Sequence, residues 1–444
     1  MRPRDQASRS LWVLRGNAGV VRRAGWGIAD QLLSSLSNFA VGLLIARSVD
    51  LATYGAFSLA FSAYLIAVSV SRAFPMSPLA IRYATASGPA FRRATAAATG
   101  TTLAGGIGCG GALLVVAALT GGAFSQALVA LGITLPGLLL QDAWRAAFFA
   151  SGRGRLAFFN DLVWVVFEMA ALAMLLVTDR TSVLLLVGAW GGSACIAAAV
   201  GAVQAGVLPR PLLVRSWYRE HDDLASRFIV EAGARVASGQ LMVYGVGIVA
   251  GLATVGTLRV GQLLFGPIQV VFYGVTLMAI PEAARALAVS LRRLRLTVAV
   301  SSGLLAVGAA AWSIAVLLIP APVGEAILRD AWGPAQSLAL PIGLTAVVGM
   351  LGFGGDLGLR ALAAASRSLR ATAITSVLGL VFGVAGAKVG GAPGCAWALF
   401  AVAAVSAGVW WFEYHRAEAA HAARHPVGGA AGPHPTTSTG GSEA

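Results

Sequence analysis

Charged residues inside long apolar segments are the residues of this sequence that could do chemistry. Between Gly25 and Gly55, Asp30 is followed by Ser34, Ser37 and Asn38 at spacings that place all four polar side chains on one helical face. A carboxylate is costly in hydrocarbon, so one in such a segment usually faces a cavity or a partner. The spacing predicts a membrane-spanning helix with a polar stripe.

A second apolar segment carries two opposite charges in ion-pair register. Glu231 and Arg235 are four residues apart, and Ser238 follows one turn later. The pair could simply fix helix packing. It could also form an anion site in which the carboxylate restrains the guanidinium until a substrate arrives.

Further charges cluster around the phrase QDAWRAAFFASGRGR. Asp142 and Arg145 are three residues apart, and the next segment carries Asp161 and, seven residues on, Glu168 on the same face. Asp142 and Asp161 flank a short basic turn, and we expect them to form interfacial salt bridges with Arg145, Arg153 or Arg155. Glu168 lies deeper and has no partner on its own helix, so it is a candidate for coupling to protons or cations.

Arginines near the ends of apolar segments suit a phosphorylated ligand, because guanidinium groups bind phosphate oxygens bidentately. Arg72 lies at one end of its segment, and Arg259 and Gln262 lie three residues apart near the other side of the membrane. The substrate-binding candidates are Asn38, Arg72, Arg145, Arg235, Arg259 and Gln262; the coupling candidates are Asp30, Glu168 and Glu231.

No catalytic constellation is visible in the sequence. The five histidines lie in the central linker or the tail, and the three cysteines lie in separate apolar segments without metal-ligand spacing. No G-x-x-x-x-G-K-[ST] motif for nucleotide phosphates is present. We therefore expect neither an enzyme nor a bound metal or cofactor.

Composition assigns the chain to the membrane. It is 57% hydrophobic and 11% charged over 444 residues, with a mean hydropathy of +0.78, whereas soluble domains carry about 25% charged residues. The net charge of +14 comes from arginines spread over short loops. That distribution is typical of the positive-inside rule and not of a nucleic-acid-binding surface, so no nucleic-acid partner is expected.

The apolar segments predict an all-α polytopic membrane protein with twelve transmembrane helices in two six-helix bundles around a central cavity. The predicted spans are about 25–46, 52–72, 94–119, 125–149, 157–178, 182–206, 228–250, 257–280, 296–319, 334–357, 371–388 and 394–413. The predicted organisation is a basic N-terminus (1–24), a first bundle (25–206), a linker (207–227), a second bundle (228–413) and a disordered tail (414–444).

The two halves repeat one unit. LATYG at 51–55 recurs as LATVG at 252–256, and both halves begin from the same side of the membrane. The repeat is therefore parallel, which predicts a substrate path between the bundles and alternating access by rocking. Few basic residues fall in loops of the opposite side, so both termini are expected in the cytoplasm. Those few are Arg47, Arg180, Arg259, Arg329 and Lys388.

The chain resembles Wzx-like polysaccharide flippases of the multidrug/oligosaccharidyl-lipid/polysaccharide exporter superfamily. The phrases that carry the likeness are IARSVDLATYGAFSLA, LQDAWRAAFFASGRGRLAFFNDLVW and VGTLRVGQLLFGPIQV, and the likeness spans residues 25–413. It implies movement of an undecaprenyl-diphosphate-linked oligosaccharide across the inner membrane, driven by H⁺ or Na⁺, with contacts to membrane lipids and polysaccharide-assembly proteins. The residues that match as carriers are Arg72, Arg145, Glu231, Arg235 and Arg259.

Four alternatives to a polysaccharide flippase differ in what they require of the sequence. A cation-exporting multidrug transporter of the same fold would favour acids and aromatics over Arg235 and Arg259. The lipid II flippase usually has fourteen spans. A polysaccharide polymerase or ligase would carry a large outer loop, which this sequence lacks. A non-transporting component of an envelope assembly is compatible with the sequence.

Overall fold

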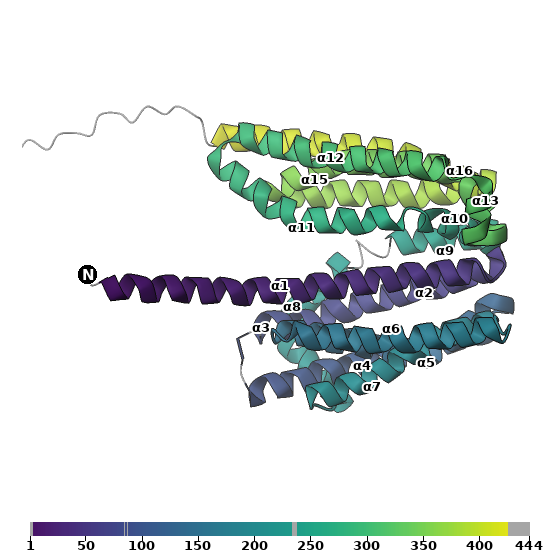
Figure 1. The fold of residues 1–444 in the computed structure, drawn as a ribbon, viewed down its shortest axis with the longest axis horizontal. Helices are drawn as coiled ribbons and strands as arrows, with labels where there is room; N and C mark the ends of the chain where they lie inside the picture. The colour runs from purple at the N-terminus through teal and green to yellow at the C-terminus, as the bar shows by residue number, and fades with distance from the viewer. Residues whose placement is uncertain (1–2, 84, 87, 233–237, 425–444) are drawn as a thin grey trace, which may run out of the picture.

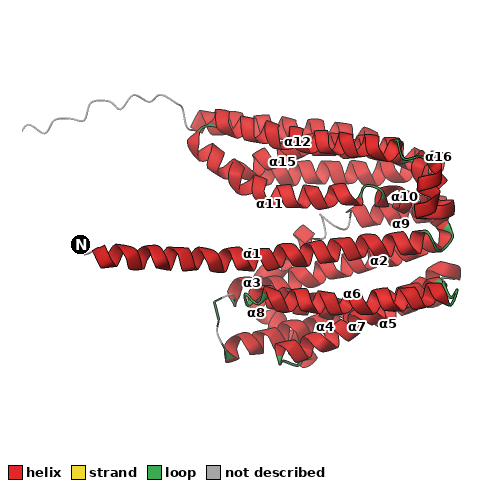
Figure 2. Cartoon of the chain, viewed as in Figure 1, coloured by secondary structure: helices red, strands yellow, loops and turns green. Residues whose placement is uncertain are grey.

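Helices form every regular element in the part of the chain that the structure describes. The computed structural model describes residues 3–83, 85–86, 88–232 and 238–424, and no strand occurs in them (Figure 2). Helices satisfy all their backbone groups within one segment, which is what hydrocarbon requires. Ten of the described helices are long and apolar enough to cross a membrane, so the chain is a multi-pass membrane protein.

The first half of the chain forms one bundle, the N-terminal lobe (Figure 1). Its last membrane helix is followed by a short 3-10 turn (Pro211–Leu213) and by the linker helix α8. The elements are α1 (Pro3–Ala46), α2 (Leu51–Ser71), a π-helical turn (Arg72–Met76), α3 (Ser77–Arg82), α4 (Pro89–Leu119), α5 (Gly122–Ala150), α6 (Gly154–Val177), α7 (Val183–Ala205) and α8 (Val214–Ala232).

The second half forms the C-terminal lobe, drawn green to yellow in Figure 1. A 3-10 turn (Arg329–Ala331) separates its two shortest helices. The elements are α9 (Ser238–Ala250), α10 (Leu252–Leu263), α11 (Gly266–Val289), α12 (Leu291–Leu317), α13 (Ala321–Leu328), α14 (Trp332–Ser337), α15 (Ala339–Ala361) and α16 (Ala365–Arg424).

The two predicted spans at 371–388 and 394–413 fall in a single helical element. Helix α16 bends at Gly390 and Gly391, where the backbone leaves the helical region, and each predicted span occupies one arm. The predicted span 228–250 covers the end of α8, the undescribed residues 233–237 and the short apolar helix α9. The count of twelve thus stays a prediction beside ten long apolar helices among the described residues.

Two predicted segment ends differ from the structure. Helix α16 continues past residue 413 to Arg424, because Glu413 and Glu418 are buried and pair with Arg367 and Arg295. Only residues 425–444 of the predicted tail lie outside the described part. Helix α1 begins at Pro3, so the basic N-terminal segment continues the first membrane helix without a break.

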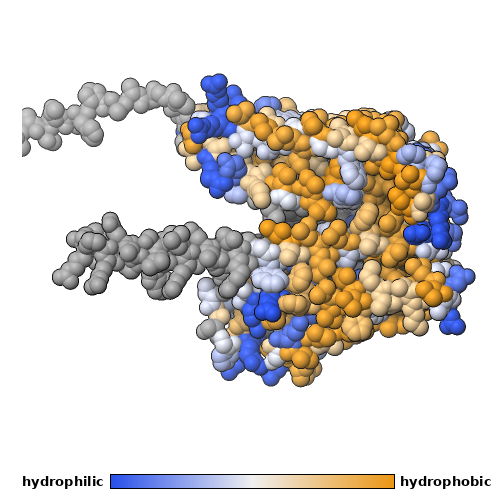
Figure 3. Space-filling view, in the orientation of Figure 1, coloured by the Kyte–Doolittle hydropathy of each residue, from blue (hydrophilic) through white to orange (hydrophobic). Residues whose placement is uncertain are grey.

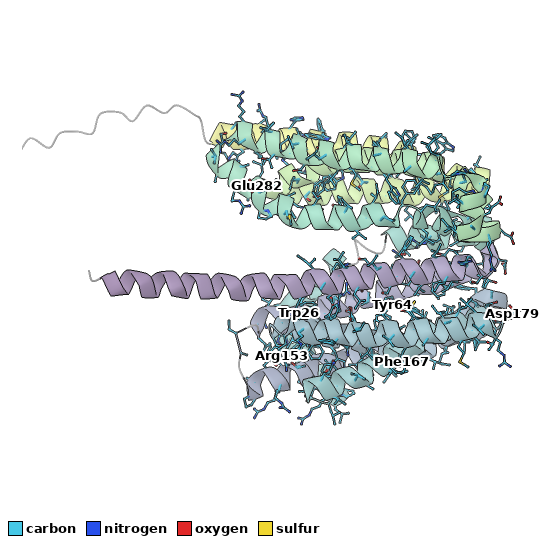
Figure 4. The ribbon with its side chains drawn as sticks, viewed as in Figure 1. Trp26, Tyr64, Arg153, Phe167, Asp179 and Glu282 are labelled. Atoms are coloured by element: carbon cyan, nitrogen blue, oxygen red, sulfur yellow. The ribbon has the colours of Figure 1, made fainter. Side chains whose placement is uncertain are left out.

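The surface confirms the membrane assignment. Hydrophobic residues cover the middle of the visible face, and hydrophilic residues gather at its two ends (Figure 3). Figure 4 places Asp179 at one end and Arg153 and Glu282 at the other. Such a belt between polar ends matches a bilayer core and its two interfaces.

The lobes meet at the end of the molecule where α2 and α10 begin. Gly55 of α2 lies against Leu252 of α10, and Gly256 of α10 lies against Leu51 of α2. The repeated pentapeptides thus contact each other across the lobes. At the opposite end, Figure 3 shows the surface hollowed beneath the C-terminal lobe. The molecule therefore has a cleft that is closed at the α2–α10 end and open at the other.

Candidate functional site

A buried charge network lies inside the N-terminal lobe, on helices that the sequence places far apart. Arg145 of α5 donates from Nε to Asp30 Oδ2 of α1 at 2.7 Å, and the same Nε lies 3.2 Å from Asp161 Oδ2 of α6. Asp30 is fully buried, and Asp161 is nearly so. Arg145 therefore joins three helices through one guanidinium group.

A second ion pair lies beside the first. Arg72 donates to both carboxylate oxygens of Asp142, at 2.9 Å from Nε and 2.6 Å from Nη2. Arg72 begins the π-helical turn that also contains Pro75. Proline removes a backbone donor, and π-turns of this kind occur often at functional sites. The turn sets Arg72 against α5, although more than half of its side chain stays exposed.

Neutral polar side chains extend the network toward α7. Gln141 donates to Asp161 Oδ1 at 2.7 Å and to Asn160 Oδ1 at 3.3 Å, and Asn160 donates to Gln204 Oε1 at 3.1 Å. Gln141 and Asn160 are both buried. Sequence reasoning did not select these residues, although amide side chains inside apolar segments are a signal that could have found them.

The network has more acid than base. Its three carboxylates, on Asp30, Asp142 and Asp161, face the two guanidinium groups of Arg72 and Arg145. Asp30 Oδ1 is buried and has no hydrogen-bond partner among the described residues. Such an arrangement has room for one positive charge, either a proton or a cation.

Glu168 lies on α6 two helical turns beyond Asp161. Its side chain is buried, and its Oε1 has no hydrogen-bond partner in the described part of the chain. The sequence selected Glu168 because it lacked a partner on its own helix, and the structure shows no ion pair to it from the described parts of other helices. An ionised carboxylate in this position would be costly, so the site favours a protonated side chain or a bound cation.

Arg259 of α10 lies at the interface between the lobes. Its guanidinium donates to three neutral oxygens: Ser62 Oγ of α2 at 3.0 Å, Gln240 Oε1 of α9 at 3.2 Å, and Gln262 Oε1 at 3.2 Å. Its Nε is buried without a partner, and the described residues offer it no carboxylate. Because the positive charge is uncompensated, this position would hold an anionic group favourably.

The remaining predicted site residues differ in where they lie. Asn38 is exposed on α1, one turn before Gly42, which contacts Leu263 of the C-terminal lobe. Arg235 falls outside the described residues, and so does the side chain of Glu231. The structure thus brings Asp30, Arg72 and Arg145 together in one network, while Arg259 and Gln262 form a separate group at the interface between the lobes.

No group of three or more histidine, cysteine, aspartate or glutamate side chains arranged as ligands of one metal ion is found within the described ranges. The charged candidates that the structure describes all lie on helices or on the π-helical turn; they are Asp30, Arg72, Arg145, Glu168 and Arg259. None of them forms a nucleophile–base pair with another. What the arrangement offers is binding of ions and polar groups inside a membrane.

No protein-family model matches the chain, and no curated protein matches it either. Solved structures do. An inward-facing multidrug-resistance transporter of the MATE family, in the MOP superfamily, aligns with a TM-score of 0.65 at 13% identity, covering 88% of this chain and 95% of that one. The chain has the fold of MOP-superfamily transporters.

Two further structures support this fold. The lipid II flippase MurJ, in its inward closed conformation, gives a TM-score of 0.64 at 9% identity, with coverage of 89% and 90%. A MOP-superfamily transporter from Pyrococcus furiosus, described as having a binding pocket of reversed polarity, gives 0.53 at 13% identity, with coverage of 90% and 96%.

Proposed function

We propose that this protein moves a polyprenyl-diphosphate-linked oligosaccharide from the inner to the outer leaflet of the cell membrane by alternating access. The observation that carries the proposal is the position of Arg259 at the interface between the two lobes. Its guanidinium is a buried cation with no carboxylate partner among the described residues. Diphosphate oxygens would supply the missing negative charge. The lipid tail would remain in the bilayer while the polar headgroup enters the cleft.

The orientation follows from the basic residues. Most arginines outside the spans lie on the side where the cleft opens, and the positive-inside rule makes that side cytoplasmic. A cleft open to the cytoplasm is the state in which a substrate assembled on the inner leaflet would enter. Arg72 lies toward this side with about half of its side chain exposed, so we assign it to binding of the headgroup as well.

The coupling step belongs to the N-terminal lobe. The acid excess around Asp30 and the unpaired carboxyl of Glu168 give two positions where H⁺ or Na⁺ would bind. Because both lie on helices of one lobe, ion binding there would alter the packing of α1 and α6 against α5. We assign Asp30 and Glu168 to coupling, and Arg145 to holding the network together.

The test is a flipping assay in proteoliposomes with a fluorescent polyprenyl-diphosphate-linked disaccharide. Arg259→Gln keeps hydrogen-bonding capacity but removes the charge, and we expect it to lower the flipping rate at least tenfold. Arg293→Gln, an exposed arginine of α12, is the matched control and should flip at the wild-type rate. Equal rates for Arg259→Gln and wild type would contradict the assignment.

Export of organic cations is the alternative, and the likeness to MATE transporters favours it as much. The same vesicles loaded with a cationic dye separate the two functions. Dye export without flipping of the lipid-linked glycan would support the multidrug transporter.

A further inference from the structure

One face of α2 packs against the C-terminal lobe in the closed half of the molecule. Leu51, Gly55, Leu59 and Ser62 follow one another at spacings of four, four and three, which places them on one side of the helix. Each of them touches α9 or α10. We call this row the seam.

The outer end of the seam is a backbone contact. A methyl group added at Gly55 would overlap the carbonyl oxygen of Leu252, and one added at Gly256 would overlap that of Leu51. The two contacts are reciprocal because the pentapeptides are copies of one repeat. Helices approach this closely only where small residues face each other.

Two hydrogen bonds continue the seam inward. The Tyr244 hydroxyl donates to the backbone oxygen of Leu59 at 2.8 Å, and Arg259 Nη2 donates to Ser62 Oγ at 3.0 Å. Ser62 is eleven residues from the start of α2, about 17 Å at 1.5 Å per residue, which is near the middle of a bilayer. The bond from Arg259 to Ser62 is therefore the innermost of these contacts of α2.

We propose that the seam is the outer gate of the transporter, and that an anionic headgroup releases it by taking Arg259 away from Ser62. A phosphate oxygen is a stronger acceptor than a neutral hydroxyl, so the exchange favours the anion. With the seam closed, the anion must first displace Ser62, whereas with the seam open Arg259 is free. The anion thus binds the open state more tightly, which is the condition for shifting the population.

The inference rests on the proposed function in one respect: the substrate must carry a negative charge. The seam itself requires no assumption about the substrate. The Gly55 contact and the Leu59 bond hold the lobes together whatever the substrate. The two parts can therefore be tested separately.

Spin-label distances measure the gate directly. On a background with all three cysteines replaced by alanine, one pair of labels at Arg180→Cys and Lys388→Cys reports the outer ends of the lobes. A second pair at Arg93→Cys and Arg293→Cys reports the open end. All four positions are exposed. Farnesyl diphosphate, which carries the diphosphate on a short prenyl chain, is the probe.

We expect the probe to raise the ratio of outward-open to inward-open molecules in the wild type. Ser62→Ala should raise this ratio about tenfold without the probe, since it removes one hydrogen bond to a charged group. Arg259→Gln should also raise it, and the probe should then have no effect. Gly55→Ala should open the outer pair, while Gly105→Ala, where an added methyl meets open space, should leave both distances unchanged.

Three results would overturn release of the seam by an anion. The first is a probe effect of equal size in wild type and Arg259→Gln. This result would agree with an anionic substrate but would show that Arg259 is not the residue that binds it. The second is unchanged distances in Ser62→Ala, which would show that the seam is not held there. The third is a wild type whose distances do not respond to the probe, although Ser62→Ala opens the outer pair. This result would leave the seam as the outer gate, but it would contradict release by an anion and the proposed substrate class.

Discussion

At the scale of single residues, Arg145 is the position where loss of a charge should cost most. Arg145→Ala would leave Asp30 and Asp161 buried without their common cation, and removal of one partner from a buried pair costs about 3–5 kcal/mol. We expect a large fall in the melting temperature of the detergent-solubilised protein. Arg153→Ala is the control, because Arg153 lies exposed over the ring of Phe148 and should cost about 1 kcal/mol or less.

Glu168 should behave in the opposite way. Its Oε1 has no partner among the described residues, so Glu168→Gln removes a costly charge without breaking an ion pair. We expect no loss of thermal stability, together with loss of the dependence of flipping on an imposed proton or sodium gradient. Retained gradient dependence in this variant would remove Glu168 from the coupling step.

At the scale of helices, glycines decide how closely α4 and α5 pack. A methyl group at Gly110 would overlap the carbonyl oxygen of Gly132, and one at Gly106 would press on Pro136. Gly110→Val should therefore destabilise the protein by about 1–3 kcal/mol, the usual range for overpacking. Gly108→Val is the matched control, since that position faces open space. Equal melting temperatures for the two variants would contradict this account.

The start of α2 depends on its capping residue. Asp50 accepts hydrogen bonds from the Thr53 hydroxyl and from the backbone N–H groups of Thr53 and Ala52, and these bonds hold the pKa of the Asp50 carboxyl below its ordinary value. Asp50→Ala should cost about 1 kcal/mol at neutral pH. Because the pKa in the folded state is lowered, the charge-dependent part of this stabilisation is present above pH about 4 and is lost as pH falls below it.

The measurement is the melting temperature of wild type and Asp50→Ala between pH about 7 and about 3. The difference between them should shrink at the acid end. Asp50→Asn, which keeps one acceptor oxygen without a charge, should show a smaller difference and little change with pH. A constant gap for Asp50→Ala across this range would show that the charge does not contribute.

Local patterns in the sequence predicted the elements of the fold but not the partners of their charges. Apolar length and arginine placement were sufficient to locate the helices, because a bilayer imposes both. The spacing of Asp142 and Arg145 suggested an interfacial salt bridge, yet Asp142 pairs with Arg72 on another helix. Which arginine pairs with Asp142 depends on how the helices pack, and in particular on the π-helical turn at Arg72. No spacing rule predicts such a turn from a single sequence.

The repeat shows the same limit at the contact between the lobes. LATYG and LATVG were recognised as copies, but nothing local indicated that the copies would touch. They do so because two lobes related by an axis along the membrane normal bring equivalent residues together at that axis. Apart from the alanines, Gly55 and Gly256 are the only small residues in their pentapeptides. The backbones of α2 and α10 meet at these two glycines.

At the scale of the whole molecule, the direction of transport depends on which side of the membrane the cleft opens. If both termini are cytoplasmic, Asp179 and Lys388 face outward and Arg93 and Arg424 face inward. Single cysteines at these four exposed positions, on the cysteine-free background, should divide accordingly when intact cells are treated with a membrane-impermeant maleimide.

We expect labelling at positions 179 and 388 in intact cells, and at positions 93 and 424 only after the membrane is permeabilised. The physical reason is the retention of arginine-rich loops on the side of synthesis, where most of the 32 basic residues lie. Labelling at position 93 in intact cells would place the open cleft outside. An inner-leaflet substrate could then not enter the state seen here, so that result would contradict the direction of transport while leaving the fold and the seam unaffected.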